Sequence, residues 1–412
     1  FFSFSYSDLV FKLKEFIKID FLSSHIYEYI RLQRLVGNKT LDKYSKFLMP
    51  ASHLMIYKGE LTNSIYWEPC FKKKRISRKK AGKQLALLLQ QSLRRLSSDN
   101  KRMGLFLSGG HDSRTIAMAS DRKLTCYTVS FSDNLEVEIA RDIAKSVGFN
   151  HKFIKLPENH YSEIARESAA ICGGMYSIDN AIFLNLDYNI KNDSDVILHG
   201  HGIDYLFQGM YLPSKTLSLI GRPTFIKILK KVPKNVAKTF VETINYRLKY
   251  INHADFILEK FRPLVEEKLV QSVQDTLKNI TAKNLSPSDQ WEFLTINGLS
   301  RHYSWPNIAS KMTLAPVRTP IFDNDIFDFY LSLPNKLRVT AGALRAAQNQ
   351  LNKDTALIAT ANFGLPSSES PFKKTLRLIS RKILRDFAGK ENLVAPSLKD
   401  RTWPDRDIYL SE

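Results

Sequence analysis

The stretch MGLFLSGGHDS, residues 103–113, decides the fold, because a short apolar run stops abruptly at two glycines. Its first five residues, Met103–Leu107, predict a buried strand. Helical character resumes at 115–120, a second strand is predicted at 124–131, and a second helix at 136–147. This alternation predicts an α/β fold with a doubly wound parallel sheet, covered on both faces by helices, whose ligands bind at the carboxyl ends of the strands.

The same pattern recurs further along the chain. A short apolar strand, 195–198, leads to a second pair of glycines, Gly200 and Gly202. Two strand ends therefore present loops of similar chemistry. Leucines at helical spacing predict an amphipathic helix at 80–96, and the region 213–340 is predicted to be mostly helical.

The composition indicates an ordinary globular enzyme. The chain has 412 residues and 43% hydrophobic content, enough for a full core and for more than one domain. It contains no run of about eighteen apolar residues, and its first residues lack the basic front and the cleavage site of a signal peptide. We therefore expect no membrane span and a cytoplasmic location. Cys70, Cys126 and Cys172 are scattered, so neither a disulfide nor a structural zinc site is expected.

The formal net charge of +20 suits nucleic acid, an anionic membrane face or anionic substrates. Much of the excess lies in local basic runs, such as 72–75 and 373–385. No RNA-binding aromatic signature accompanies these runs. A solvated basic surface is therefore favoured over a specific nucleic-acid groove.

The residues of the first loop favour a phosphate ligand with a metal. Gly109 and Gly110 let backbone N–H groups approach an anion closely, because no Cβ stands in the way. Ser108 and Ser113 add hydroxyl donors, while Asp112 is suited to Mg²⁺ that bridges to phosphate. The alternative is a strand-to-helix turn that merely uses glycine.

The second loop supplies a further carboxylate. The two common phosphate signatures are absent, since no G-x-x-x-x-G-K-[ST] occurs and Tyr205 stands where a dinucleotide motif needs its third glycine. Asp204 follows this loop, and a hard cation commonly uses one or two carboxylates together with phosphate oxygens. Asp112 and Asp204 are therefore predicted to share Mg²⁺. The alternative for a lone loop aspartate is a turn or cap residue.

Residues 104–113 resemble the S-G-G-x-D-S pyrophosphatase loop of asparagine synthetases, β-lactam synthetases and lasso-peptide cyclases. Other segments resemble this family in the same order: 127–151 its second strand, helix and G-x-x-H turn, 199–209 its S-G-E-G-x-D-E-L-F-G-G string, and 318–323 its R-x-P-F-L-D. The likeness extends over roughly residues 37 to 370. It implies an adenine-nucleotide α-hydrolase-like fold and cleavage of ATP between its α and β phosphates.

The resemblance implies three sets of binding residues: Leu107, Val129 and Gly200 for adenine and ribose; Ser108, Gly109, Gly110 and Ser113 for pyrophosphate; and Asp112 with Asp204 for Mg²⁺. It also implies two catalytic candidates. His201 stands where the family has a glutamate general base, and a histidine can accept that proton near neutral pH. Its alternative role is that of a turn residue between glycines. Arg318 of the R-x-P-F-L-D segment is the second candidate.

Two departures from the family pattern concern the acceptor side. Pro316 replaces the glutamate that precedes R-x-P-F-L-D, and Asn362 replaces a lysine that stabilises developing charge in the family. Arg345 and Lys353 are nearby candidates to supply that charge. These changes argue against ordinary asparagine synthesis. A branch of the family associated with surface-polysaccharide gene clusters, with S-G-G-x-D-S-R and H-G-x-G-x-D, resembles the chain better.

The first seventy residues resemble the end of the family's glutamine-hydrolysing domain. Residues 22–36 predict a helix and 48–67 a β-hairpin. The catalytic N-terminal cysteine of that domain has no counterpart, because Cys70 lies too far downstream, so either the chain is a fragment or its ammonia comes from elsewhere. We predict three parts: a remnant of an α+β glutamine amidohydrolase domain at 1–70, an ATP-pyrophosphatase domain with a helical C-terminal part at 71–370, and a basic helical tail at 371–412.

The leading hypothesis is an ATP-dependent, amide-forming ligase. It would adenylate a carboxylate, aspartate or a related acid, and transfer ammonia or an amine, with glutamine as a candidate donor. Two alternatives stay open: an RNA-modifying enzyme with the same loop, which would suit the net charge, and a nucleotide-binding scaffold that has lost turnover. We expect small-molecule partners and no specific nucleic acid, and we leave a homodimer open.

Overall fold

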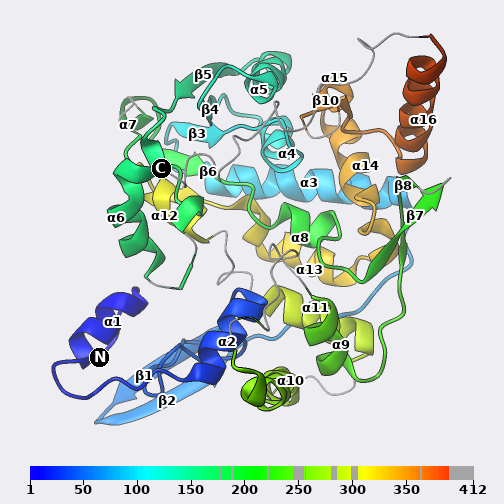
Figure 1. Cartoon of the computed structure of the whole chain (residues 1–412). Helices are drawn as coiled ribbons and strands as arrows, with labels where there is room; N and C mark the ends of the chain where they lie inside the picture. Colours follow the sequence, from blue (N-terminus) through cyan, green and yellow to red (C-terminus); the bar gives the residue numbers. More distant parts are fainter. Residues whose placement is uncertain are drawn as a thin grey trace. The chain divides into compact units, whose positions relative to one another are not determined.

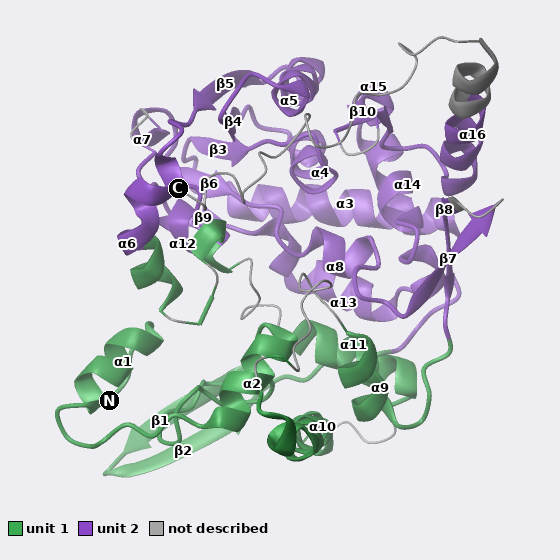
Figure 2. Ribbon diagram, viewed as in Figure 1, with its two compact units in different colours: residues 1–71, 168–180, 231–306 green, residues 72–167, 181–230, 307–412 purple. Residues whose placement is uncertain are grey.

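The computed structural model describes residues 1–173, 175–176, 178–186, 190–219, 222–244, 255, 257–279, 285–297, 305–361 and 364–388. The chain forms two compact units, coloured separately in Figure 2. Unit 1 comprises Phe1–Phe71, Ser168–Asn180 and Lys231–Pro306, and unit 2 comprises Lys72–Glu167, Ala181–Lys230 and Asn307–Glu412. The predicted division at 1–70, 71–370 and 371–412 stays a prediction, since unit 1 also takes in two later segments.

Unit 2 is built on a five-stranded sheet in which every pairing is parallel (Figure 1). Its strands, in spatial order, are β5 (Asn150–Lys155), β4 (Thr125–Ser130), β3 (Met103–Phe106), β6 (Val196–Leu198) and β9 (Val317–Arg318). The chain enters at β3, moves outward to β4 and β5, and returns to β6 on the other side of β3. The expected doubly wound α/β sheet is confirmed, and its topological switch point lies between β3 and β6.

Helices next to the strands cover this sheet. α4 (Asp112–Ala119) contacts β3, and α5 (Leu135–Ser146) contacts β4 and β5. α3 (Arg78–Leu96) buries the predicted leucine stripe and packs along α14 (Gly342–Leu351). The Asn134 side chain caps α5 by accepting from two backbone N–H groups of its first turn. The helices predicted at 80–96, 115–120 and 136–147 are thus confirmed.

The region 213–340 is less helical than its sequence predicts, because it contains a hairpin of β7 (Ser214–Leu219) and β8 (Arg222–Leu229). Other elements of unit 2 are α7 (Ile190–Asp193), α8 (Ile203–Phe207), α13 (Asn324–Ser332), α15 (Lys353–Leu357), β10 (Ala359–Thr360), β11 (Leu365–Pro366) and α16 (Pro371–Ala388). α6 (His160–Cys172) and α12 (Trp305–Met312) have residues in both units.

Unit 1 contains the predicted helix and hairpin of the first seventy residues. Its elements are α1 (Tyr6–Leu13), α2 (Ser23–Leu32), β1 (Ser52–Tyr57), β2 (Glu60–Ile65), α9 (Val236–Thr243), α10 (Arg262–Lys278) and α11 (Pro287–Asn297). The buried Glu28 joins distant segments, since its carboxylate accepts from the Val36 N–H at 2.7 Å and from the Ser272 hydroxyl at 2.7 Å. Within the described part of the chain, no helix is both long and apolar enough to cross a bilayer.

Candidate active site

The two glycine loops lie on either side of the switch point. One follows β3 and the other follows β6, so both are at the carboxyl ends of adjacent parallel strands. They approach each other closely, because a Cβ added to Gly200 would lie 3.0 Å from the Cβ of Asp112. Any side chain at position 200 would therefore crowd this contact. The carboxyl-end crevice at a switch point is where open α/β sheets bind their ligands.

The first loop is closed by its two serines. The backbone N–H of Ser108 donates to Oγ of Ser113 at 3.0 Å, and the two hydroxyl oxygens lie 3.1 Å apart. The Gly110 N–H donates to Oγ of Ser108 at 3.3 Å. A Cβ added to Gly110 would have only this Ser108 oxygen within 4 Å, at 3.4 Å. The loop thus leaves free space directly beside Gly110, where a phosphate group would fit.

Arg114 ties this loop to the β10–β11 hairpin. Its fully buried guanidinium donates to the carbonyl oxygens of Ile358 at 2.6 Å, Ala359 at 2.7 Å and Gly109 at 3.3 Å. A Cβ added to Gly109 would lie 2.6 Å from that of Ala361, so glycine is required here. Burial lowers the pKa of Arg114 to about 10, which leaves it charged at neutral pH. The arginine that follows S-G-G-x-D-S is therefore a positioning residue.

The loops bring Asp112 and Asp204 together. Burial, and next the neighbouring Asp204 carboxylate, raises the pKa of Asp112 well above its ordinary value. Nε2 of Gln208 donates to Oδ1 of Asp112 at 2.6 Å and partly offsets this effect. A divalent cation between two such carboxylates would relieve their repulsion. The described residues contain no group of three or more Asp, Glu, His or Cys side chains suited to a metal, so phosphate oxygens would have to complete the coordination.

Glu136, in the first turn of α5, is a site residue that the sequence reasoning missed. Its side chain is buried, and burial raises its pKa to about 7. The backbone N–H of Gly109 hydrogen-bonds to this carboxyl group and moderates the shift. Glu136 therefore titrates near neutral pH directly beside the first loop. The sequence shows that Glu136 lies two residues after the capping residue Asn134, but it does not show that Glu136 is buried against Gly109.

The second loop is held by α12. The Nδ1 atom of His199 accepts from the His201 N–H at 2.9 Å, and Nε2 of His199 lies 3.1 Å from Oδ1 of Asn307. This pairing places the proton on Nε2. Nζ of the buried Lys311 donates to the same Oδ1 and lies 3.5 Å from the centre of the Phe183 ring. Burial, and next Lys311, lowers the pKa of His199 well below its ordinary value, so His199 is a neutral structural residue.

His201, the predicted general base, is mostly buried within this second loop. Its ring centroid lies 5.9 Å from that of Tyr205 and 6.0 Å from that of Phe322. It belongs to the same segment as Gly200 and Asp204, so the structure brings it to the switch point with them. Its catalytic role stays a prediction.

The predicted adenine and ribose residues lie on the neighbouring strands. The Leu107 N–H donates to the Tyr127 carbonyl at 2.8 Å, which continues the β3–β4 pairing up to the loop. Thr128 donates its hydroxyl to the Leu107 carbonyl at 2.8 Å. Val129 is half-buried near the end of β4. The backbone at Leu107 and Val129 thus borders the first loop, while their contact with adenine stays a prediction.

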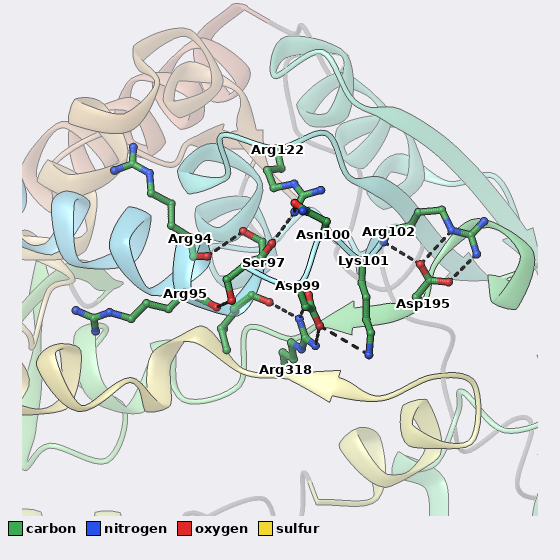
Figure 3. Close-up of polar contacts among 12 residues, drawn as sticks. Arg94, Arg95, Ser97, Asp99, Asn100, Lys101, Arg102, Arg122, Asp195 and Arg318 are labelled. Carbon is green, nitrogen blue, oxygen red and sulfur yellow. Dashed lines mark hydrogen bonds and ion pairs between the residues drawn. The ribbon is translucent and has the colours of Figure 1, made fainter.

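The backbone carbonyl of Arg318 accepts from the His199 N–H at 2.9 Å, but the side chain of Arg318 does not reach the two loops. Its guanidinium pairs with Asp99, with Nη1 donating to Oδ1 at 3.0 Å, and it also donates to the Leu96 carbonyl. Figure 3 shows Arg318 turned toward Asp99, in the segment that precedes β3 and so lies at the amino end of the strand. The hydrogen bonds from Arg318 lower the pKa of Asp99. The catalytic role of Arg318 stays a prediction, and what the geometry supports is a structural ion pair.

A second ion pair, between Arg102 and Asp195, lies at the same amino end of the strands (Figure 3). Nη2 of Arg102 donates to Oδ1 of Asp195 at 2.7 Å, and its backbone N–H donates to Oδ2 at 2.9 Å. This pair aligns the starts of β3 and β6, the strands whose other ends carry the loops.

Two residues depart from the family pattern on the acceptor side. The carbonyl of Pro316 accepts from the Ile197 N–H at 2.9 Å and extends the sheet, while Asn362 lies outside the described residues.

Comparison with known proteins gives one family and one distant curated relative. Residues 84–408 match the family described as asparagine synthase. Asparagine synthetase [glutamine-hydrolyzing] 1 of Bacillus subtilis (strain 168) is 24% identical over 359 residues, which cover 78% of this chain and 54% of that protein. The chain thus spans about half the length of the curated relative that it matches.

Two solved structures show a weak likeness. NMN synthetase from Francisella tularensis is 12% identical, with 55% of this chain and 96% of that chain covered and a TM-score of 0.26. NH3-dependent NAD synthetase from Campylobacter jejuni is 15% identical, with 52% and 100% covered and a TM-score of 0.23. The family match covers most of the chain, and together with the doubly wound sheet it confirms the adenine-nucleotide α-hydrolase-like fold class. The chain belongs to the asparagine synthase family.

Proposed function

We propose that the chain is an ATP-dependent ligase that adenylates a carboxylate and passes the acyl group to ammonia or an amine. The observation that carries this proposal is the meeting of Asp112 and Asp204 at the switch point, beside a glycine loop with space for phosphate. Two half-buried carboxylates that repel each other are costly without a cation. Mg²⁺ bound to ATP would supply both the cation and the remaining oxygen ligands.

Different residues of the two loops would bind the phosphates and the metal during adenylation. Ser108, Gly110 and Ser113 would hold the β and γ phosphates, and Mg²⁺ on Asp112 and Asp204 would neutralise the charge that develops as pyrophosphate leaves. The substrate carboxylate attacks the α-phosphorus, and the bond to the oxygen bridging the β-phosphorus breaks. The main contribution of the protein is positioning and charge stabilisation.

In the second step a nitrogen nucleophile attacks the acyl carbonyl and AMP leaves with the electron pair of the bond that breaks. The nucleophile must lose a proton, and His201 is the residue of the second loop that we assign to accept it. His199 is unsuited to this task, because its Nδ1 already accepts from the backbone.

Exchange of labelled pyrophosphate into ATP tests the first step. We expect exchange with at least one acid from a panel of small carboxylates that includes aspartate, and a loss of at least about tenfold in Ser113→Ala. Ser120→Ala is the matched control, since Ser120 follows α4 and its hydroxyl bonds, among the described residues, only to the backbone of Arg122. Equal rates of exchange in both variants would show that the first loop takes no part in adenylation.

A nucleotide-binding homologue without turnover is the second candidate. Pro316 favours it, because this position contributes a backbone carbonyl to the sheet and no carboxylate to the site. The two candidates separate clearly: binding of Mg-ATP without exchange for any acid supports the second and rejects the first.

A further inference from the structure

A cavity of about 840 Å³ lies in unit 2. Its walls come from the first turns of α3 and α16 and from one face of α14, elements that can be followed in Figure 1. None of the residues 108–113 or 199–204 lines it. A volume in this range suits a small organic molecule better than a single ion.

The lining of this cavity is strongly basic. Five of its side chains are Arg or Lys and one, Glu369, is acidic. Oε1 of Glu369 is already paired with Nη2 of Arg377 at 2.7 Å. Among the residues that the structure describes, the other four cations make no side-chain hydrogen bond or ion pair: Arg78, Lys79, Arg345 and Lys373. The cavity therefore holds uncompensated positive charge.

Arg345 is the least expected of these cations, because it is 8% exposed and yet its guanidinium has no hydrogen-bond or ion-pair partner within the described ranges of the chain. Burying a charge without a partner is strongly unfavourable. Lys374, next to the cavity and also 8% exposed, adds a second buried cation. Burial, and next Arg345, lowers the pKa of Lys374 to about 8. Burial, and next Arg78, lowers the pKa of Arg345 to about 10.

The backbone adds to the positive potential. Gly342 is the first residue of α14 and lines the cavity, and no side chain caps this helix end. Arg78 begins α3, and Lys373 lies in the first turn of α16. The N-terminal ends of three helices, each of eight or more residues, thus meet at one cavity, where their dipoles favour an anion.

We propose that this cavity binds the phosphate group of a small molecule, with Arg345 as the central ligand and Arg78 and Lys373 at the rim. The planar guanidinium of Arg345 would bind two phosphate oxygens at once. The volume leaves room for an organic part beside the phosphate. This site does not depend on the nucleotide site or on its chemistry.

Isothermal titration of the whole chain with ribose 5-phosphate at low salt tests the proposal. We expect binding by the unaltered chain, loss of binding in Arg345→Gln, and at least tenfold weaker binding in the double variant Arg78→Gln/Lys373→Gln. Lys123→Gln, an exposed lysine of the same unit, and Ser113→Ala in the first loop should bind within twofold of the unaltered chain. Arg78 and Lys373 are exposed, so the double variant should fold even if Arg345→Gln does not.

Thermal unfolding gives a second readout. Without ligand, Arg345→Gln should melt at a higher temperature than the unaltered chain, because it removes a buried charge. Ribose 5-phosphate should raise the melting temperature of the unaltered chain and not that of the variant.

The outcomes divide clearly. Inorganic phosphate that binds as tightly as the sugar phosphate supports the site and assigns it to the free anion. Absence of ribose 5-phosphate binding, equal binding in the double variant, or an equal loss in Ser113→Ala would each overturn the proposal. A single-stranded RNA that binds the double variant as well as the unaltered chain, while ribose 5-phosphate binds neither, would place the basic charge in nucleic-acid binding instead.

Discussion

Nε2 of Gln208 donates a hydrogen bond of 2.6 Å to Oδ1 of Asp112, across 96 positions of sequence. This bond holds one carboxylate of the predicted metal pair in place while Asp204 opposes its ionisation. Gln208 follows α8, the helix that contains Asp204, so one short helix supplies both the repulsion and the donor that orients Asp112. The pair is thus fixed before any cation binds.

The negative charge on Asp112 should lower the stability of the ligand-free chain. The same charge should be needed for the binding of Mg-ATP. Asp112→Asn should raise the melting temperature of the ligand-free chain at pH 7.5, because the amide removes the repulsion and its oxygen still accepts from Gln208. The same variant should weaken the binding of Mg-ATP by at least about tenfold. Calorimetric melting and isothermal titration measure the two effects.

Asp204→Asn and the double variant complete this test. If mutual repulsion is the cause, the double variant gains less melting temperature than the sum of the single variants. A lower melting temperature in both single variants would show that the carboxylates stabilise the ligand-free fold and are not a cation site.

Glu136 should make stability depend on pH near neutrality. Its pKa is raised to about 7 in the folded chain from an ordinary 4.5, so the folded state binds more protons than the unfolded state between these values. The free energy of unfolding should therefore fall as pH rises from about 4.5 to 7. Glu136→Gln should remove this loss and be more stable than the unaltered chain at pH 8, by on the order of 3 kcal/mol.

Urea unfolding at pH 5 and pH 8 measures this difference. Glu138→Gln is the matched control, because Glu138 lies on the same helix with an exposed side chain. It should change stability by less than about 0.5 kcal/mol at either pH. A similar pH dependence in Glu136→Gln and in the unaltered chain would exclude Glu136 as its source.

Local patterns were sufficient to predict the sheet and its two loops. An apolar run that ends in Ser108-Gly109-Gly110 indicates both a buried strand and a loop at its end, and the second run, which ends before Gly200, does so in the same way. Parallel pairing then puts both loops at the same edge. Asp112 and Asp204 could be paired from the sequence for this reason.

The supporting residues could not be predicted, because their roles depend on contacts between distant segments. Gln208 stands where the resembled family has glycine, but nothing local indicates that it reaches Asp112. Asn307 and Lys311 come from a helix more than a hundred residues after the loop that they hold. For Arg318 the motif gave the strand but not the direction of the side chain, which pairs with Asp99 instead.

Arg114 should be essential for the stability of the first loop. Arg114→Met leaves three carbonyl acceptors without their charged donor, so we expect a loss of at least about 3 kcal/mol in the free energy of unfolding. Arg94→Met is the control, since Arg94 makes an exposed ion pair with Asp121 and should cost less than about 1 kcal/mol. Urea unfolding compares them.

Hydrogen exchange shows where the Arg114 effect lies. Peptides that cover 356–361 and 107–113 should lose protection first in Arg114→Met, because the guanidinium joins these segments. Uniform loss of protection across unit 2 would instead indicate a general core defect.

His201 should separate the two half-reactions of the proposed ligase. His201→Gln should retain pyrophosphate exchange within about threefold, because adenylation needs no proton transfer from this residue. Ammonia-dependent release of AMP should fall by about a hundredfold or more, the range expected when a general base is lost. Both rates are measured with the acid that supports exchange. Hydroxylamine, which attacks acyl groups without a base, should restore acyl transfer in the variant. An equal loss of exchange and of AMP release would instead assign His201 to the folding of the second loop, as a turn residue between Gly200 and Gly202.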